Sequence, residues 1–131
     1  MTIELTMLAL SVGLGLVQIV AASHFASFQR GYRWTASSRD EPAEPLRGVA
    51  GRLDRALRNF LETFPLFAAV VLSAHAAGRH SALTEVGAQL YFWGRVAYLP
   101  LYASGIPLLR SLVWNVAAAG ILLFLVALLW G

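Results

Sequence analysis

The amino-acid sequence predicts an all-α integral membrane protein, folded as one domain of four transmembrane helices. The first observation is composition: 58% of the 131 residues are hydrophobic and 13% are charged, whereas soluble domains carry about 25% charged residues. The second is that the apolar residues form four segments, each near the ~20 residues that a bilayer requires. The third is that arginines gather in one connection between the segments, which is typical of cytoplasmic loops.

The first two spans are predicted at residues 3–28 and 49–77. The first is interrupted only by Glu4, Gln18 and His24. No basic residue precedes it, so we expect a retained span and not a cleaved secretory signal. The second is most apolar after Asn59, although its helix is expected to begin near residue 49.

The last two spans are predicted at residues 83–103 and 107–130, after tight connections. The third carries Glu85, Gln89 and Arg95 within a mainly apolar run. Pro107 suits the first turn of the fourth helix, because the N–H that proline lacks would have no partner there.

The long connection at residues 29–48 is polar and punctuated by prolines, so one continuous helix is not expected there. Seven arginines lie between the apolar parts of the first two spans, and Arg110 lies on the same side of the bundle. The opposite side has Arg79 alone. The positive-inside rule therefore predicts that this loop is cytoplasmic and that both termini are not. We expect a multi-pass protein of a bacterial inner membrane.

One face of the second span carries four polar residues: Arg52, Arg55, Asn59 and Glu62. At about 100° per residue, they fall within roughly 80° of one another. Ionisable groups at membrane depth usually face a protein interior or a wet cavity and mark functional sites. Arg52 and Arg58 have a simpler alternative role, which is to anchor the helix at lipid head groups.

The third span carries a second stripe: Tyr91, Arg95, Tyr98 and Tyr102. These positions fall within roughly 60° on a helix. A buried arginine needs an acidic partner or a charged ligand, and Glu62, at similar depth, is the expected protein partner. Tyr91 is interpreted mainly as a packing residue. A purely structural ion pair between Glu62 and Arg95 or Arg58 is the alternative.

Together, the two stripes predict a polar pocket within the bilayer that opens to the cytoplasm. Arginine, asparagine, glutamate and tyrosine side chains suit a small zwitterionic or anionic ligand with several carboxylates. Neither stripe can face lipid, and one four-helix chain has little interior to bury both. We therefore expect a homotrimer with the stripes at subunit interfaces.

The composition also excludes several classes of site. The chain has no cysteine, so disulfides, zinc–thiolate sites and a cysteine nucleophile are excluded. All ten basic residues are arginines, and most of them flank the spans, without the interleaved aromatics of a nucleic-acid surface. His24, His75 and His80 show no metal-ligand spacing, so they are interpreted as interfacial residues and no metal site is expected.

These stripes resemble the signatures of the MAPEG family, the membrane-associated proteins in eicosanoid and glutathione metabolism. The first part of the resemblance is the pattern Arg52-x-x-Arg55-Ala56-x-x-Asn59-x-x-Glu62-x-x-Pro65. The second is Gly94-Arg95-Val96-Ala97-Tyr98, followed by Tyr102 and by Pro107-x-x-Arg110-Ser111. The chain also resembles a bacterial-type member in its length, its number of spans and its loop placement.

The resemblance implies homotrimers that bind glutathione between neighbouring subunits at the cytoplasmic side. It implies that Arg55, Asn59 and Glu62 contact glutathione. It further implies that the opposite wall is formed by Arg95, Tyr98 and Tyr102. Arg110 would then lie near the thiol or a glutathione carboxylate.

We interpret the protein as a glutathione-dependent transferase or peroxidase that acts on lipophilic electrophiles or hydroperoxides. A free thiol with a pKa of about 8.5 is only a few per cent thiolate at pH 7. A nearby cation lowers that pKa, and Arg110, Arg30 and Arg33 remain open as candidates.

The alternative is a non-catalytic MAPEG-like protein or a small carrier with Glu62 as its polar site. A carrier usually needs polar groups near the bilayer midplane, whereas here they cluster toward one side.

Overall fold

The structure is a computed structural model that describes residues 1–130, and its regular elements are all helices. In chain order they are α1 (Ile3–Arg30), α2 (Tyr32–Ala36), α3 (Gly48–Ala76), α4 (Ala82–Ala103) and α5 (Pro107–Trp130). The described residues include no strand. The predicted loop at residues 29–48 contains the short α2, which the sequence pattern did not indicate.

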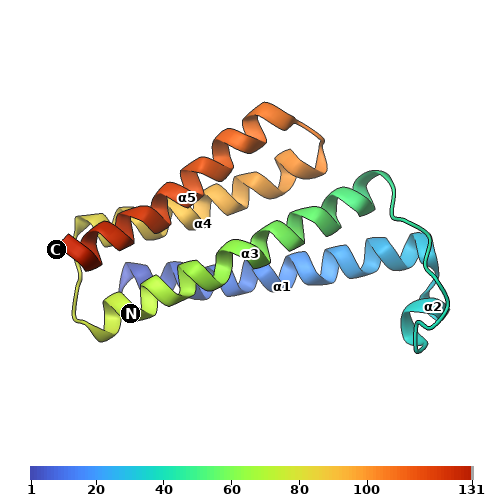
Figure 1. Cartoon of the computed structure of the whole chain (residues 1–131), viewed down its shortest axis with the longest axis horizontal. Coiled ribbons are helices and arrows are strands. Elements are labelled where there is room, and N and C mark those ends of the chain that lie inside the picture. The colour runs from blue at the N-terminus through green and yellow to red at the C-terminus, as the bar shows by residue number, and fades with distance from the viewer. Residues whose placement is uncertain (131) are drawn as a thin grey trace.

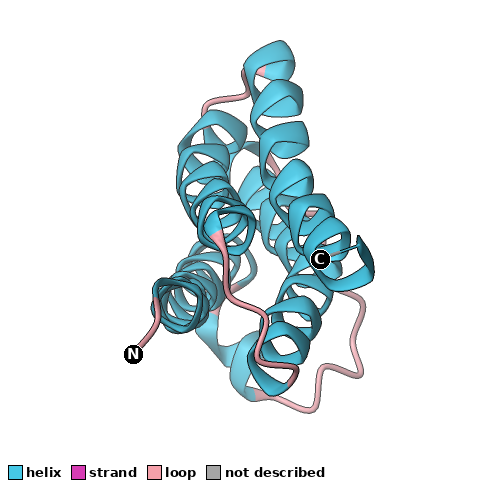
Figure 2. Ribbon diagram, turned by 90° about the vertical axis from the view of Figure 1, so that its left-hand side faces the viewer, coloured by secondary structure: helices cyan, strands magenta, loops and turns pink. Residues whose placement is uncertain are grey.

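The four long helices form two antiparallel pairs, α1 beside α3 and α4 beside α5 (Figure 1). The start of α1 and the end of α5 lie at the same end of the bundle (Figure 1, Figure 2). At the opposite end, the α4–α5 hairpin diverges from α1 and α3 (Figure 1). We call these the terminal end and the loop end, because the 29–48 connection lies at the second.

Short-range interactions define where the helices begin and end. The Thr2 hydroxyl caps α1 by accepting from the backbone N–H of Leu5 at 3.2 Å, as expected of an N-cap threonine. Ser81 and Thr84 form a capping box at the start of α4. Gly31, at φ 93°, separates α1 from α2 in a conformation that other residues rarely adopt.

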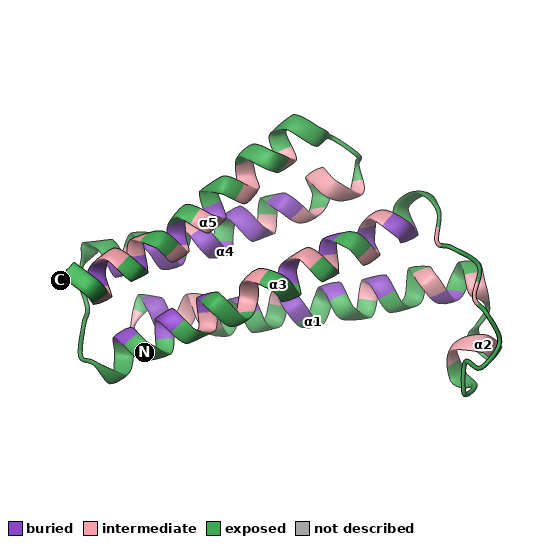
Figure 3. Cartoon of the chain, in the orientation of Figure 1, coloured by how far each residue is buried: buried purple, intermediate pink, exposed green. Residues whose placement is uncertain are grey.

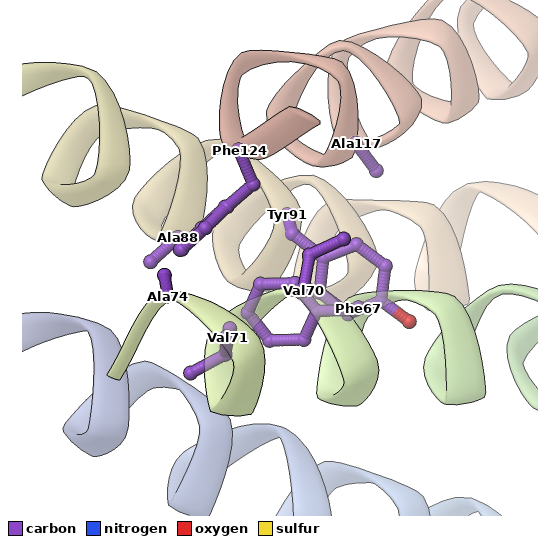
Figure 4. Close-up of a cluster of buried hydrophobic side chains, with 8 residues drawn as sticks. All are labelled: Phe67, Val70, Val71, Ala74, Ala88, Tyr91, Ala117 and Phe124. Carbon is purple, nitrogen blue, oxygen red and sulfur yellow. The ribbon is translucent and has the colours of Figure 1, made fainter. Parts of the chain in front are cut away.

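The core lies between α3, α4 and α5 and is built on stacked aromatic rings (Figure 4). Tyr91 is fully buried and stacks on Phe67 with ring centroids 4.0 Å apart. Its hydroxyl is 3.0 Å from the Thr63 hydroxyl, so the polar end of this ring is satisfied. Tyr91 is thus placed in the core, away from the polar pocket described below.

Helices α4 and α5 approach closely at a pair of glycines. A Cβ added at Gly120 would lie 2.4 Å from the carbonyl oxygen of Gly87, and one at Gly87 would lie 2.7 Å from that of Gly120. Only residues without a side chain permit this contact, which fixes α5 against α4.

Three helices are long and apolar enough to cross a membrane: α1, α3 and α5. The outward faces of α1 and α5 are largely exposed (Figure 3) and carry large apolar side chains such as Leu16, Val17 and Leu122. These features support an all-helical membrane protein. Helix α4 has 22 residues but is not among these three helices, so the fourth crossing remains a prediction.

Candidate functional site

Arg95 is the central buried charge of the loop end. Arg95 is 1% exposed. Its Nη1 donates to Asn59 Oδ1 on α3 at 2.8 Å. Its guanidinium carbon lies 4.1 Å from the centre of the Tyr98 ring, one turn further along α4. The Nε and Nη2 nitrogens are buried without a hydrogen-bond partner. The chain therefore holds a guanidinium whose hydrogen-bonding capacity it only partly uses.

The expected partner of Arg95 was Glu62, and that expectation is wrong. Glu62 is exposed, and the described residues show no ion pair between it and Arg95 or Arg58. Along α3, at about 100° per residue, Asn59 lies roughly 60° closer than Glu62 to the buried face that holds Phe60 and Phe67. The polar stripe runs along the rim of this face, so Asn59 reaches α4 while Glu62 points outward.

Tyr102 lies between two further arginines near the end of α4. Arg55 Nε donates to the Tyr102 hydroxyl at 3.2 Å. The Arg110 guanidinium carbon lies 4.8 Å from the centre of the same ring, within cation–π range. Tyr98 and Tyr102 meet edge to face at 5.6 Å. The tyrosines thus connect three cations from three helices.

A pocket of about 350 Å³ opens beside these rings. Its lining residues are Asn59, Tyr98, Tyr102, Arg110, Ser111, Trp114 and Asn115. Among the described residues, no carboxylate forms an ion pair with Arg55, Arg95 or Arg110. The pocket therefore has positive charge, tyrosine hydroxyls and amide groups on its walls, which suits an anionic ligand that can accept several hydrogen bonds.

Comparison with known protein families gives a match to the MAPEG family over residues 7–130. The chain belongs to the MAPEG family. A comparison with proteins of curated function found no match. The pocket lies wholly inside the matched region, and so do the motifs that carry the resemblance.

Two candidate residues of this MAPEG protein lie away from the pocket. Arg30 Nε donates to the carbonyl oxygen of Glu44 at 3.0 Å, and its guanidinium lies over Trp34. Arg33 is exposed and lines a separate cavity together with Arg30. Within one chain, neither lines the pocket with Arg110.

Two other arginines of α3, Arg52 and Arg58, form contacts within the chain that give each of them a structural role. Arg52 Nε donates to the carbonyl oxygen of Ala103 at 2.7 Å, at the end of α4. Arg58 forms an exposed ion pair with Asp54, at 3.2 Å, on the same helix. Such surface pairs contribute little to stability.

Three pocket residues, all on α5, were not among the predicted site residues: Ser111, Trp114 and Asn115. Trp114 is half-buried, and its Nε1 has no acceptor among the described residues. A signal was available: Trp114 follows Arg110 by four residues, so both share one face of the helix. In this MAPEG chain, α5 therefore contributes a wall and not only the single arginine.

Proposed function

We propose that this MAPEG protein is a membrane-bound, glutathione-dependent transferase or peroxidase acting on lipophilic electrophiles or hydroperoxides. The observation that carries the proposal is the buried guanidinium of Arg95, two of whose nitrogens have no hydrogen-bond partner among the described residues. It contacts Asn59 and Tyr98, which line the pocket together with Arg110. A buried charge of this kind is stabilised when an anion binds. Family membership supports glutathione as that anion.

Glutathione matches the pocket in chemistry. It has two carboxylates, one amine and one thiol, so it bears a net negative charge before the thiol ionises. The guanidinium groups of Arg55 and Arg95 can bind carboxylates bidentately, while Asn59 and Glu62 offer acceptors to the amine. Hydrogen bonds to charged groups contribute about 1.5–3 kcal/mol each.

The reaction needs no protein nucleophile, because the co-substrate supplies the thiol. Arg110 favours the thiolate over the thiol by placing positive charge beside it. In the transferase reaction, the thiolate sulfur forms a bond to the electrophilic carbon of the substrate. The electron pair of the bond that breaks at this carbon goes either to a leaving group or to an atom of the substrate that then accepts a proton. In the peroxidase reaction, two glutathione molecules reduce one hydroperoxide to an alcohol and water and become a disulfide.

We also propose that the functional unit is a homotrimer. Glu62 is exposed on a helix that is apolar enough to cross a membrane, and a carboxylate facing lipid is costly. A neighbouring subunit that covers this face would remove the cost. It would also allow Arg30 or Arg33 of one chain to approach the pocket of another. In that case one of these arginines would activate the thiol together with Arg110.

Titration calorimetry with glutathione, on the full chain in mild detergent, tests the proposal. Arg55→Ala should weaken binding by about 10–100-fold. It should leave the fold intact, because Arg55 is exposed and, among the described residues, its hydrogen-bond and cation–π contacts are both with Tyr102. The matched control is Arg58→Ala, one turn further along the same helix, which should bind like the parent.

Orientation and assembly are tested separately. A reporter fused after Gly131 should be found on the non-cytoplasmic side, and native mass spectrometry should detect trimers. If the parent does not bind glutathione at about 10 mM, or if Arg55→Ala binds it equally well, the site is wrong and the non-catalytic alternative is preferred.

A further inference from the structure

A second cluster of ionisable groups lies at the terminal end, far along the bundle from the pocket. Glu4, in the first turn of α1, is 5% exposed. Its Oε2 accepts from the Thr84 hydroxyl at 2.7 Å and contacts His80 Nδ1 at 2.5 Å. The other ring nitrogen of His80 lies 3.2 Å from Glu85 Oε1. One imidazole thus stands between two carboxylates from different helices.

The cluster has an unsatisfied acceptor and uncompensated negative charge. Glu4 Oε1 is buried and has no hydrogen-bond partner, and Glu4 lines a pocket of about 220 Å³ together with His80. Two carboxylates beside a neutral imidazole carry a charge of −2, and protonation of His80 reduces this only to −1. Arg79 lines the same pocket, but its guanidinium is directed to the carbonyl oxygen of Ala127, at 3.5 Å.

We propose that Glu4, His80 and Glu85 bind a divalent transition-metal ion such as Zn²⁺. One ligand atom from each of the three residues lies within 4.8 Å of the other two. A Zn²⁺ ion binds imidazole nitrogen and carboxylate oxygen at about 2.0–2.2 Å. It would neutralise the two carboxylates, and it would supply the partner that Glu4 Oε1 lacks. The imidazole ligand favours zinc and its neighbours over magnesium or calcium, which prefer oxygen ligands.

The surroundings of the three residues fit this role. The Thr84 hydroxyl orients the Glu4 carboxylate, as outer hydrogen bonds commonly orient metal ligands. His80 is about half exposed and Glu85 about one-third exposed, so the ion can enter from water and both side chains can close around it. Water would complete the coordination.

A bound ion would join parts of the chain that are distant in sequence. Glu4 begins α1, His80 lies in the connection between α3 and α4, and Glu85 lies in the first turn of α4. The ion would therefore hold the start of the first helix against the α3–α4 hairpin. This role is independent of the proposed glutathione chemistry at the loop end.

Zinc titration of the full chain, in detergent, without an affinity tag and without glutathione, tests the proposal. We expect one ion per chain and a higher unfolding temperature, since a ligand that binds only the folded state stabilises it. Glu85→Gln should weaken zinc affinity by about 10–100-fold; this side chain is partly exposed, so the variant should fold. Cobalt should give visible d–d absorption in the parent and lose it in His80→Ala.

His75→Ala is the matched control, because His75 lines the same pocket but is not one of the three clustered residues. It should bind zinc like the parent. The proposal is overturned if the parent binds well below one ion per chain at about 100 µM zinc. It is also overturned if Glu85→Gln and His80→Ala bind zinc as the parent does, which would indicate adventitious surface binding.

Discussion

The two ends of the bundle hold buried charge in opposite ways. At the loop end, Arg95 is buried against the neutral Asn59, and the charged groups that lie over the Tyr102 ring are also cations, Arg55 and Arg110. At the terminal end, Glu4 is buried against His80 and Thr84, which are groups that a carboxylate can use. The pocket at the loop end therefore gathers cations that form no ion pair with a carboxylate among the described residues, whereas the buried carboxylate at the terminal end contacts an imidazole and a hydroxyl of the chain.

This difference separates a charge that the chain leaves largely unpaired, at Arg95, from a charge that the chain partly satisfies, at Glu4. Removing a charge that the chain itself satisfies leaves a partner unpaired and lowers stability. Removing a buried charge that has no partner in the chain relieves a desolvation penalty, so stability is not lowered. What is lost is affinity for the ligand that would pair with that charge. Substitutions at the two ends should therefore affect different measurements.

Arg95→Met should have the largest effect on binding. We expect glutathione affinity to fall by about 100-fold, because at least one charge-assisted contact of up to about 3 kcal/mol is lost. The unfolding temperature without glutathione should be unchanged or higher, because no protein carboxylate loses its partner. Calorimetry and thermal unfolding measure the two quantities. A large loss of stability without ligand would break the comparison, since it would mean that the fold depends on Arg95.

Glu4→Leu should show the reverse pattern at the terminal end. It leaves the Thr84 hydroxyl and the His80 ring without their shared acceptor, so we expect the free energy of unfolding to fall by about 2 kcal/mol. The measurement is denaturant unfolding in the presence of a chelator, so that bound metal does not contribute. Glutathione affinity should stay within about twofold of the parent. A marked loss of glutathione binding would show that the two ends are coupled.

Arg110→Ala tests which arginine at the loop end activates the glutathione thiol. The cation beside the bound thiol lowers the thiol pKa, so its removal raises that pKa and decreases the thiolate fraction at neutral pH. A change of one pKa unit corresponds to about 1.4 kcal/mol and a roughly tenfold loss of thiolate. The thiolate absorption band of bound glutathione, followed against pH, measures this directly. If the band is unchanged, Arg30 or Arg33 of a neighbouring chain becomes the better candidate for thiol activation.

The helical periodicity of single segments predicted much of the loop end. Arg95, Tyr98 and Tyr102 were placed on one face of their helix by spacing alone. In the structure Tyr98 and Tyr102 line the pocket, and Arg95 lies against the Tyr98 ring. The partner of Arg95 could not be predicted in this way. It depends on how α3 is rotated against α4, and a rotation of roughly 60° decides between Asn59 and Glu62.

The terminal end could not be found from the sequence, for a different reason. Glu4 and His80 are 76 residues apart, and no periodicity relates positions on separate helices. Their contact follows from the antiparallel pairing of α1 with α3, which brings the start of one helix beside the end of the other (Figure 1). His80 and Glu85 are five residues apart, a spacing that indicates no metal site by itself.

Glu62→Gln should have the smallest effect and gives the finest test of the comparison. Within one chain Glu62 is exposed and unpaired with Arg95, so its neutralisation should not leave a buried arginine without a partner, and the unfolding temperature without glutathione should stay as in the parent. If Glu62 accepts from the glutathione amine, its loss should reduce affinity by about three- to tenfold, less than the loss of Arg95, because the amide oxygen of glutamine still accepts a hydrogen bond. Calorimetry and thermal unfolding on the same preparation measure the glutathione affinity and the unfolding temperature.

A lower unfolding temperature with unchanged glutathione affinity would contradict this expectation. It would identify Glu62 as a structural counter-ion that pairs with an arginine of the neighbouring subunit in the assembled protein.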